Sequence, residues 1–220
     1  MTKHDNSALQ LERIVFFSDA VFAIAITLLI IEIKVPHLEH EATNREFWLA
    51  LLKLVPNFVG YFFSFFVVGA YWMGHHEIYG DIVRWNKGLM WRNIAFLAAI
   101  AFFPFSTAFY SEYPTNFVPL SLYAGSFALA GFLGTWQWRY AVKQKLVDES
   151  LTEKTISRQT WHYTVLPIVG VTAILIGLIK PLLAGFAFWL IPISQIIIRK
   201  KFAENKKTSK LINDEFTGKN

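Results

Sequence analysis

The chain has 220 residues, of which 54% are hydrophobic, 17% aromatic and 17% charged, and its formal charge is +5. A soluble domain is usually about 45–50% apolar and about 25% charged, so this composition indicates a protein that is solvated by lipid. Cysteine is absent, which excludes disulfides, thiolate metal sites, iron–sulfur clusters and cysteine nucleophiles. The basic residues lie beside long apolar runs, where they signal membrane topology, and nucleic acid is not an expected partner.

Six apolar runs along the chain are long enough to cross a bilayer. At about 1.5 Å per residue, a helix of about 20 residues spans a hydrocarbon core about 30 Å thick. Lipid offers no hydrogen-bond partners to the backbone, so such runs form helices, and the alternating segments of about ten residues that a β-barrel needs are absent. We therefore predict an all-α membrane protein with six transmembrane helices, over residues 11–33, 47–73, 89–109, 117–141, 161–179 and 182–198.

The basic residues are divided unevenly between the two ends of these helices. If the N-terminus is cytoplasmic, 17 of the 21 lysines and arginines lie on the cytoplasmic side, and only Lys34, Arg45, Lys53 and Lys180 lie outside. Cytoplasmic loops are enriched in such residues, so we expect a multi-pass protein of the cell membrane with both termini in the cytoplasm. Residues 1–200 are predicted to form one transmembrane domain, followed by a polar cytoplasmic tail over residues 201–220.

The first predicted helix has two different faces when it is plotted at 100° per residue. One face is an apolar stripe with a threonine at its edge, formed by Ile24, Thr27, Leu28 and Ile31. Ser18 and Asp19 point away from this stripe. Taken alone, such a stripe is typical of helix packing or of contact with lipid.

Asp19 lies inside the first predicted helix, where a carboxylate is costly. The penalty is about 2.5–3.5 kcal/mol at a helix centre and less near the interface, and such residues usually face a partner in the protein. Arg13 lies 120° away around the helix, so the two are expected to find partners on the second and third spans. We predict a structural polar network made of Arg13, Phe17, Ser18, Asp19, Trp72, His75, His76, Arg92 and Asn93.

A proton relay is a more specific interpretation of some of these residues than a structural network. A histidine beside a carboxylate can titrate near neutral pH, which makes Asp19 with His75 and His76 a candidate relay. A fixed metal site is not expected, because adjacent histidines do not share a helical face and no third ligand is evident.

Four residues at the head of the first helix, Arg13, Phe17, Ser18 and Asp19, resemble the signature of the transmembrane protein 175 family of potassium channels. The run over residues 20–29, Ala-Val-Phe-Ala-Ile-Ala-Ile-Thr-Leu-Leu, continues the likeness. Two later pieces also fit the family pattern, Tyr71-Trp72-x-x-His75-His76 and Trp91-Arg92-Asn93. The six-span layout is similar from end to end, whereas the specific residues are concentrated in the first three spans.

The resemblance implies a potassium-permeable cation channel. Bacterial members of the family are single six-helix units that assemble as homotetramers, and this chain holds one such unit. Their pore is lined by the first helix of each subunit and has no carbonyl selectivity filter. Carried across by spacing from Asp19, the pore and gate positions are Ile24, Thr27, Leu28 and Ile31. The implied partners are further copies of the chain, potassium and other monovalent cations, and the lipid bilayer.

In such a pore, four Ile24 side chains would form an apolar ring too narrow for a hydrated cation, so conduction would stop by steric closure or dewetting. Thr27, one turn away, offers hydroxyl oxygens to potassium in transit past Thr27 and Ile24. Glu32 is expected at the pore mouth, where a carboxylate raises the local cation concentration. A solvated carboxylate near Lys34 is the plainer interpretation of the same residue.

A proton-coupled secondary transporter that uses Asp19, His75 and His76 is the alternative function. Such proteins are typically built from repeated halves with interrupted helices, and no repeated halves are visible in this sequence. An enzyme is not expected, because no nucleophile–base pair, phosphate loop or metal set is present in the sequence, and no cofactor is implied.

Overall fold

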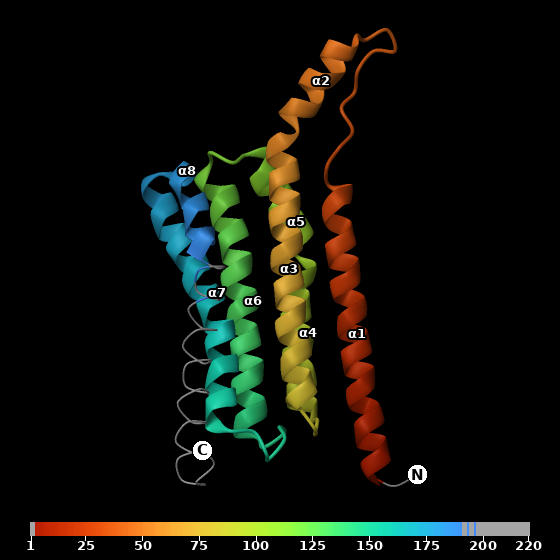
Figure 1. Cartoon of the computed structure of the whole chain (residues 1–220), viewed down its shortest axis with the longest axis vertical. Coiled ribbons are helices and arrows are strands. Elements are labelled where there is room, and N and C mark those ends of the chain that lie inside the picture. The colour runs from red at the N-terminus through yellow and green to blue at the C-terminus, as the bar shows by residue number, and fades with distance from the viewer. Residues whose placement is uncertain (1–2, 191–192, 194–195, 197–220) are drawn as a thin grey trace, which may run out of the picture.

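The computed structural model of the chain describes residues 3–190 together with residues 193 and 196. Its long helices run side by side in one bundle, with a helical extension at one end (Figure 1). The helices are α1 (Lys3–Ile31), α2 (Asn44–Lys53), α3 (Val55–Asp81), α4 (Lys87–Ala101), α5 (Phe103–Glu112), α6 (Phe117–Lys143), α7 (Glu153–Ile179), α8 (Pro181–Ala184) and the 3-10 helix η1 (Gly185–Trp189).

The described residues confirm the all-α membrane fold. Five segments of the described chain are long and apolar enough to cross a membrane, at Ser7–Ile31, Val55–Asp81, Lys87–Glu112, Phe117–Lys143 and Glu153–Ile179. The third of these consists of α4 followed directly by α5. Within the described ranges the β structure is limited to one isolated bridge, between Ile82 and Val147.

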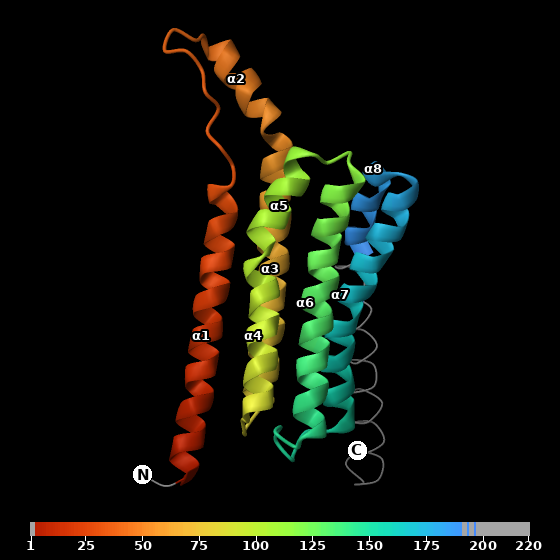
Figure 2. The ribbon, with the colours of Figure 1, turned by 180° about the vertical axis from the view of Figure 1, so that it is seen from behind.

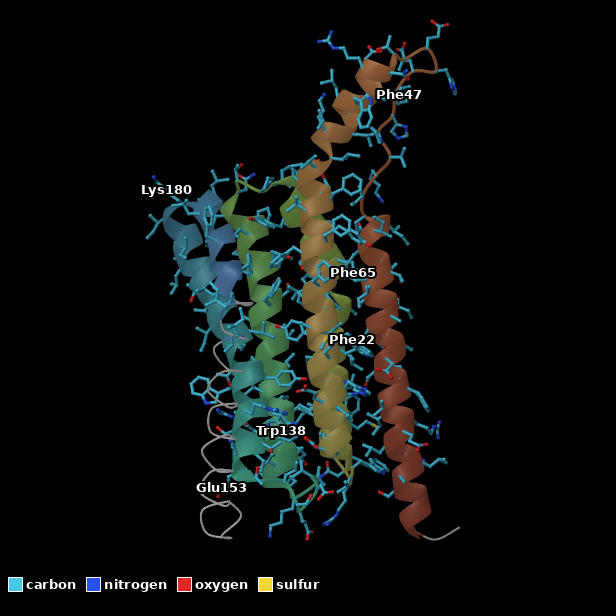
Figure 3. The ribbon with its side chains drawn as sticks, viewed as in Figure 1. Phe22, Phe47, Phe65, Trp138, Glu153 and Lys180 are labelled. Atoms are coloured by element: carbon cyan, nitrogen blue, oxygen red, sulfur yellow. The ribbon has the colours of Figure 1, made fainter. Side chains whose placement is uncertain are left out.

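Helix α1 lies at one edge of the bundle and packs against α3, α4 and α5 through one face (Figures 1 and 2). The buried side chains of that face are Ile14, Ser18, Phe22, Ala25 and Leu29, spaced three or four residues apart. This spacing places them on a single helical stripe, which is the pattern of a helix with one partner face. Figure 3 shows Phe22 on the side of α1 that faces the bundle.

The second crossing helix is shifted from its predicted position. The predicted span over residues 47–73 is wrong in its bounds, because the chain bends at Leu54 and the crossing helix α3 runs over Val55–Asp81. Pro56 has no N–H to donate, which suits the first turn of a new helix and not the interior of one. Helix α2 leans away from the bundle axis, with Phe47 far beyond the other helices in Figure 3.

Helix α2 is held at its start by a capping box. The Thr43 N–H donates to Glu46 Oε2 at 2.7 Å, while the Glu46 N–H donates to Thr43 Oγ1 at 3.4 Å. The hydrogen bonds from Thr43 lower the pKa of the Glu46 carboxyl. No residue of α2 is buried against the other described residues, so local capping and not core packing stabilises its first turn.

The third crossing segment is bent at Phe102, between α4 and α5. Pro104 lies in the first turn of α5, where a proline is tolerated. Phe102 itself caps α4, and its N–H points to the carbonyl groups of Ala99 and Ile100. The predicted run over residues 89–109 therefore covers two helices that continue each other, extended by a few residues at both ends.

Helices α6 and α7 form the most extensive pair of the bundle. Gly131 and Gly134 of α6 lie against Pro167 and Tyr163 of α7, and Gly170 of α7 lies against the α6 backbone. Small residues allow helix backbones to approach closely, as is usual for helices in membranes. Helix α7 begins at Glu153, eight residues before the predicted run over 161–179, and Glu153 and Lys180 mark opposite ends of the bundle in Figure 3.

The predicted sixth span over residues 182–198 lies partly outside the described residues, because residues 191, 192, 194, 195, 197 and 198 are not among them. Its described part begins with α8 and η1, which turn back against α7 after Lys180. The predicted tail over residues 201–220 also lies outside the described residues. The sixth transmembrane helix and the tail stay predictions.

Candidate functional site: the first helix and its polar anchor

Three buried polar side chains link α1, α4 and α3 near the middle of the first helix. Ser18 Oγ donates to the Ile14 carbonyl at 2.8 Å, and Asn93 Nδ2 donates to Ser18 Oγ at 2.9 Å. The Asn93 amide oxygen lies 2.9 Å from His75 Nε2. Since this oxygen can only accept, His75 carries a hydrogen on Nε2 and donates it. The result is one directed chain of hydrogen bonds from α3 through α4 to α1.

The imidazole of His75 is enclosed by aromatic rings. It stacks on Tyr79 at 4.3 Å and on Phe96 at 5.7 Å between ring centroids, and Phe22 of α1 lies 5.6 Å away. His75 and Asn93 are each only 1% exposed, and Ser18 is fully buried. The Nδ1 atom of His75 has no hydrogen-bond partner among the described residues. These contacts hold the ring as a packed structural element.

Asp19 is bound separately, on the neighbouring side of α1. Trp72 Nε1 donates to Asp19 Oδ1 at 2.8 Å. The Trp72 ring lies 5.8 Å from that of His76, whose side chain is exposed. A hydrogen bond to a charged acceptor is stronger than one between neutral groups, so this contact compensates part of the cost of an intramembrane carboxylate.

Arg92 is directed toward α6 and not toward α1. Its guanidinium lies over the rings of Trp136 and Tyr140, at 4.3 and 3.7 Å from their centroids, and donates to the Gly88 carbonyl at 2.8 Å. Contacts of this kind are favourable cation–π interactions. Arg92 therefore fastens α4 to α6.

The structure brings together two groups of the predicted polar network. Ser18, Asn93 and His75 form one group, and Asp19, Trp72 and His76 form the other. Arg13 and Phe17 lie on the exposed face of α1, and in the part of the chain that the structure describes Arg13 makes no hydrogen bond or ion pair. Arg92 belongs to a third contact, on the other side of α4.

Several partners were not anticipated from the sequence. Tyr79 lies four residues after His75, and this spacing in the sequence indicates that both rings share one helical face. Trp136 and Tyr140 have the same spacing on α6. A buried cluster of hydroxyl groups joins three separate helices through Ser64, Thr107 and Tyr123. The Thr107 hydroxyl donates to Ser64 at 2.9 Å, and the Ser64 and Tyr123 hydroxyls lie 2.7 Å apart. No local sequence pattern predicts this cluster.

The apolar stripe of α1 is left uncovered by the part of the chain that the structure describes. Ile24 and Ile31 are 59% and 60% exposed, and Leu28 is 39% exposed. The Thr27 hydroxyl donates to the carbonyl groups of Ala23 and Ile24, both at 2.9 Å. Because the hydrogen is used by the backbone, the lone pairs of the Thr27 oxygen stay available to a cation. Glu32 is exposed just beyond the end of α1.

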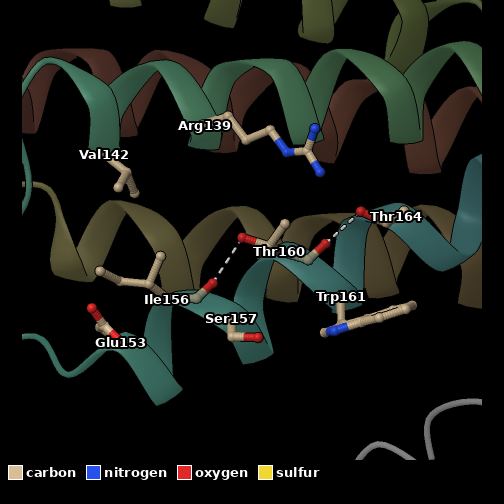
Figure 4. A pocket seen from close by; sticks show the side chains of 8 residues that line it. All are labelled: Arg139, Val142, Glu153, Ile156, Ser157, Thr160, Trp161 and Thr164. Atoms are coloured by element: carbon tan, nitrogen blue, oxygen red, sulfur yellow. Dashed lines mark hydrogen bonds between the residues drawn. The ribbon is translucent and has the colours of Figure 1, made fainter.

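A separate hollow of about 580 Å³ lies between α6 and α7, far from α1 (Figure 4). Its two threonine hydroxyls bond to their own helix, since Thr160 Oγ1 donates to the Ile156 carbonyl at 2.8 Å and Thr164 Oγ1 to the Thr160 carbonyl at 2.7 Å. Arg139 and Glu153 supply its charges. Within the described ranges no three histidine, aspartate or glutamate side chains gather as a metal site would require.

Comparison with known proteins places this arrangement in a family. Residues 13–104, which run from α1 into the start of α5, match the family described as the endosomal/lysosomal potassium channel TMEM175. A potassium channel of Chamaesiphon minutus is 36% identical over 146 residues, which cover 64% of this chain and 70% of that protein. A potassium channel of Chryseobacterium sp. is 28% identical over 201 residues, which cover 88% and 98% of the two chains.

A solved structure agrees with these likenesses. The crystal structure of a TMEM175 homologue from Chamaesiphon minutus, described as a lysosomal potassium-selective channel homologue, superposes with a TM-score of 0.72. The two chains are 29% identical, and the superposition covers 88% of this chain and 98% of the other. The family is one of ion channels and not of enzymes. The chain belongs to the TMEM175 family.

Proposed function

We propose that the chain is a potassium-permeable cation channel of the cell membrane. In this proposal, subunits assemble as a homotetramer, and the stripe of Ile24, Thr27, Leu28 and Ile31 on each α1 faces a shared conduction path. The observation that carries the proposal is the exposure of this stripe on a helix whose opposite face is fully packed. The names of the bacterial relatives as potassium channels support the choice of ion.

The position of α1 suits a pore-lining role. The helix lies at the edge of the bundle, and the face that it buries against the other described helices carries Ser18, Phe22 and Leu29. Rotational symmetry would repeat the uncovered face around a central axis, as cyclic oligomers do. Lipid contact is the other use of such a face, and the experiment below separates the two.

The chemistry of the stripe suits a gated path without a carbonyl filter. A ring of Ile24 side chains excludes a hydrated cation by size or by dewetting. Thr27, one turn along, presents an oxygen whose hydrogen is already donated to the backbone. Potassium would pass these two levels in transit, with no fixed metal site, and Glu32 would lie at the mouth.

The polar anchor, which is the hydrogen-bonded group of Ser18, Asn93 and His75, has a structural role in this proposal. The chain of hydrogen bonds from His75 through Asn93 to Ser18 sets the rotation of α1 about its own axis. That rotation decides which residues face the conduction path. The Trp72–Asp19 bond restrains the same helix from a second direction.

A proton-coupled transporter has less support. A relay through Asp19, His75 and His76 would need contact between the carboxylate and an imidazole. Instead, the Asp19 carboxylate accepts from Trp72, and the His75 ring bonds to Asn93. The channel is therefore the preferred function.

The decisive experiment replaces Ile24 with Asn and measures potassium flux from proteoliposomes. A polar ring would remove the dewetting barrier, and we expect basal flux to rise about tenfold, which corresponds to a barrier lower by about 1.4 kcal/mol. Ile30→Asn is the matched control, because Ile30 is also exposed on α1 but lies 120° from Ile24. A stable Ile24→Asn tetramer with native flux would remove Ile24 from the pore, and flux that depends on a coupled solute would favour a transporter.

A further inference from the structure

A second pocket lies at the end of the bundle that carries α2 and α8, enclosed by α3, α5, α6 and η1. Its volume is about 400 Å³, and its described lining includes Val59, Phe63, Tyr110, Ser111, Tyr123 and Phe188. None of the described lining residues is charged. Pockets that bind small molecules usually measure about 300–1,000 Å³ and combine apolar walls with a few polar groups.

The walls of this pocket are aromatic and packed against one another. Tyr110 and Tyr123 stack at 5.1 Å between ring centroids. Phe188 of η1 lies 5.3 Å from the ring of Phe63 and 5.6 Å from that of Tyr123. Rings drawn from four helices thus form a rigid cavity, and Val59, which is 62% exposed, lies at its outer side.

One polar group in this lining lacks a partner. Ser111 is only 8% exposed, and its hydroxyl has no hydrogen-bond partner among the described residues. A helical serine commonly donates to the carbonyl four residues earlier, which Ser111 does not do. The neighbouring Tyr123 hydroxyl is already bonded to Ser64 at 2.7 Å. Gly60 leaves room for the Ser111 hydroxyl, because a side chain there would collide with it.

We propose that this pocket binds a hydrocarbon chain that carries an uncharged oxygen acceptor, with the Ser111 hydroxyl donating a hydrogen bond to that oxygen. The apolar walls select the chain, the absence of charge in the described lining rejects ions, and the free donor selects a single acceptor. The pocket also lies near the helix ends, the level at which lipid ester groups meet the hydrocarbon core. The acyl ester of a membrane lipid and a free long-chain alcohol share this chemistry.

The test uses photolabelling of the full chain in phosphatidylcholine nanodiscs. The probe is hexadecanol with a diazirine in its chain, and the labelled peptides are mapped by mass spectrometry. We expect labels concentrated in residues 56–63 and 110–123, with excess unlabelled hexadecanol removing them. Labels spread evenly over the lipid-facing helices would overturn the proposal.

Two variants locate the site. Val59→Trp fills the outer side of the pocket from an exposed position, and we expect about a tenfold loss of labelling there. Val118→Trp is the matched control, since Val118 is 65% exposed near the same end of the bundle and is not part of the described lining. Equal loss in both variants, or in neither, would contradict the assignment. Size-exclusion profiles check that each variant remains assembled.

The role of Ser111 is tested by competition. Because a neutral hydrogen bond changes affinity by about threefold to tenfold, Ser111→Ala should weaken competition by hexadecanol by that factor and leave competition by hexadecane unchanged. Equal competition by the alcohol and the hydrocarbon in the native chain would overturn recognition of the oxygen.

The source of the ligand is separated in a second arm. Phosphatidylcholine that carries a diazirine in one acyl chain replaces the free alcohol probe. Labelling of the same peptides by both probes identifies membrane lipid as a source, whereas labelling by the alcohol alone identifies a free amphiphile. Labelling by neither probe overturns the proposal. None of these measurements depends on ion conduction, so the site is tested independently of the proposed channel.

Discussion

At the scale of single residues, Asn93 joins the first helix to the rest of the helical bundle. Its amide donates to Ser18 and accepts from His75, so both ends of the side chain are used. All three residues are buried, and a buried polar group that loses its partner costs about 1–3 kcal/mol. The position therefore tolerates few other side chains, because leucine has the branched shape of asparagine but neither its donor nor its acceptor.

This arrangement leads to a prediction about coupling. We expect Asn93→Ala and Ser18→Ala each to lower stability by about 1–3 kcal/mol, and the double variant to lose clearly less than the sum, because the two side chains share one bond. Thermal unfolding in detergent measures both effects. Ile94→Ala, at an exposed neighbouring position, is the control. Strictly additive losses would show that Ser18 and Asn93 are not coupled.

At the scale of whole elements, the α6–α7 pair depends on the absence of side chains. A Cβ atom at Gly170 would lie 2.5 Å from the Ala124 carbonyl oxygen and 2.9 Å from the Ala128 nitrogen. Both are backbone atoms, so neither can turn aside as a flexible side chain could. By contrast, a Cβ atom at Gly125 would meet nothing within 4 Å.

The two glycines give a matched pair of variants. Gly170→Ala forces the helices apart, and we expect a loss of about 1–3 kcal/mol, the usual effect of overpacking. Gly125→Ala should be neutral or slightly stabilising, because alanine favours the helix by up to about 1 kcal/mol over glycine. Melting temperatures of the purified proteins distinguish the two. If Gly170→Ala has the same melting temperature as the native chain, the close approach of α6 and α7 is wrong.

The elements also mark where sequence reasoning succeeded and where it could not. Hydropathy located the crossing helices because lipid solvation acts on every residue of a span. It misplaced the second one because Phe47, Trp48 and Leu52 of α2 are as apolar as a span, although none of them is buried. Only the bend before Pro56 separates this helix from α3.

The contacts of the candidate site could likewise be predicted only in part. The grouping of Ser18 with Asn93 and His75 could be predicted, because polar residues at one depth in a membrane seek one another. The placement of Arg92 could not, because it depends on which side of α4 the rings of Trp136 and Tyr140 occupy. Which face of a helix packs against a given neighbour does not appear as a periodic pattern in a single sequence.

At the scale of the whole molecule, orientation in the membrane is open to a direct test. The chain has no cysteine, so single cysteines can be introduced without background. Thr115 lies in the connection between α5 and α6, and Ser150 lies in that between α6 and α7, both exposed. The uneven distribution of basic residues predicts that the first connection is external and the second cytoplasmic.

We therefore expect a membrane-impermeant maleimide to label Thr115→Cys on intact cells and Ser150→Cys only after permeabilisation. The label is detected on gels, so the side of the membrane on which each connection lies is determined without purification. The native chain, which has no thiol, is the control for reaction of the maleimide with groups other than the introduced cysteine. The reverse pattern would invert the proposed orientation and place both termini outside.

The uncovered face of α1 is asymmetric in side-chain volume, and this has a consequence for opening. On one flank of Ile24 lie Ala20, Ala23 and Thr27, and on the other lies Leu28. In the proposed homotetramer, turning each α1 by about 60° toward the small flank, less than one residue step of 100°, would exchange the four Ile24 side chains at the axis for methyl and hydroxyl groups. The proposed pore would then widen as each helix turns about its own axis, and no helix would tilt outward into the bilayer.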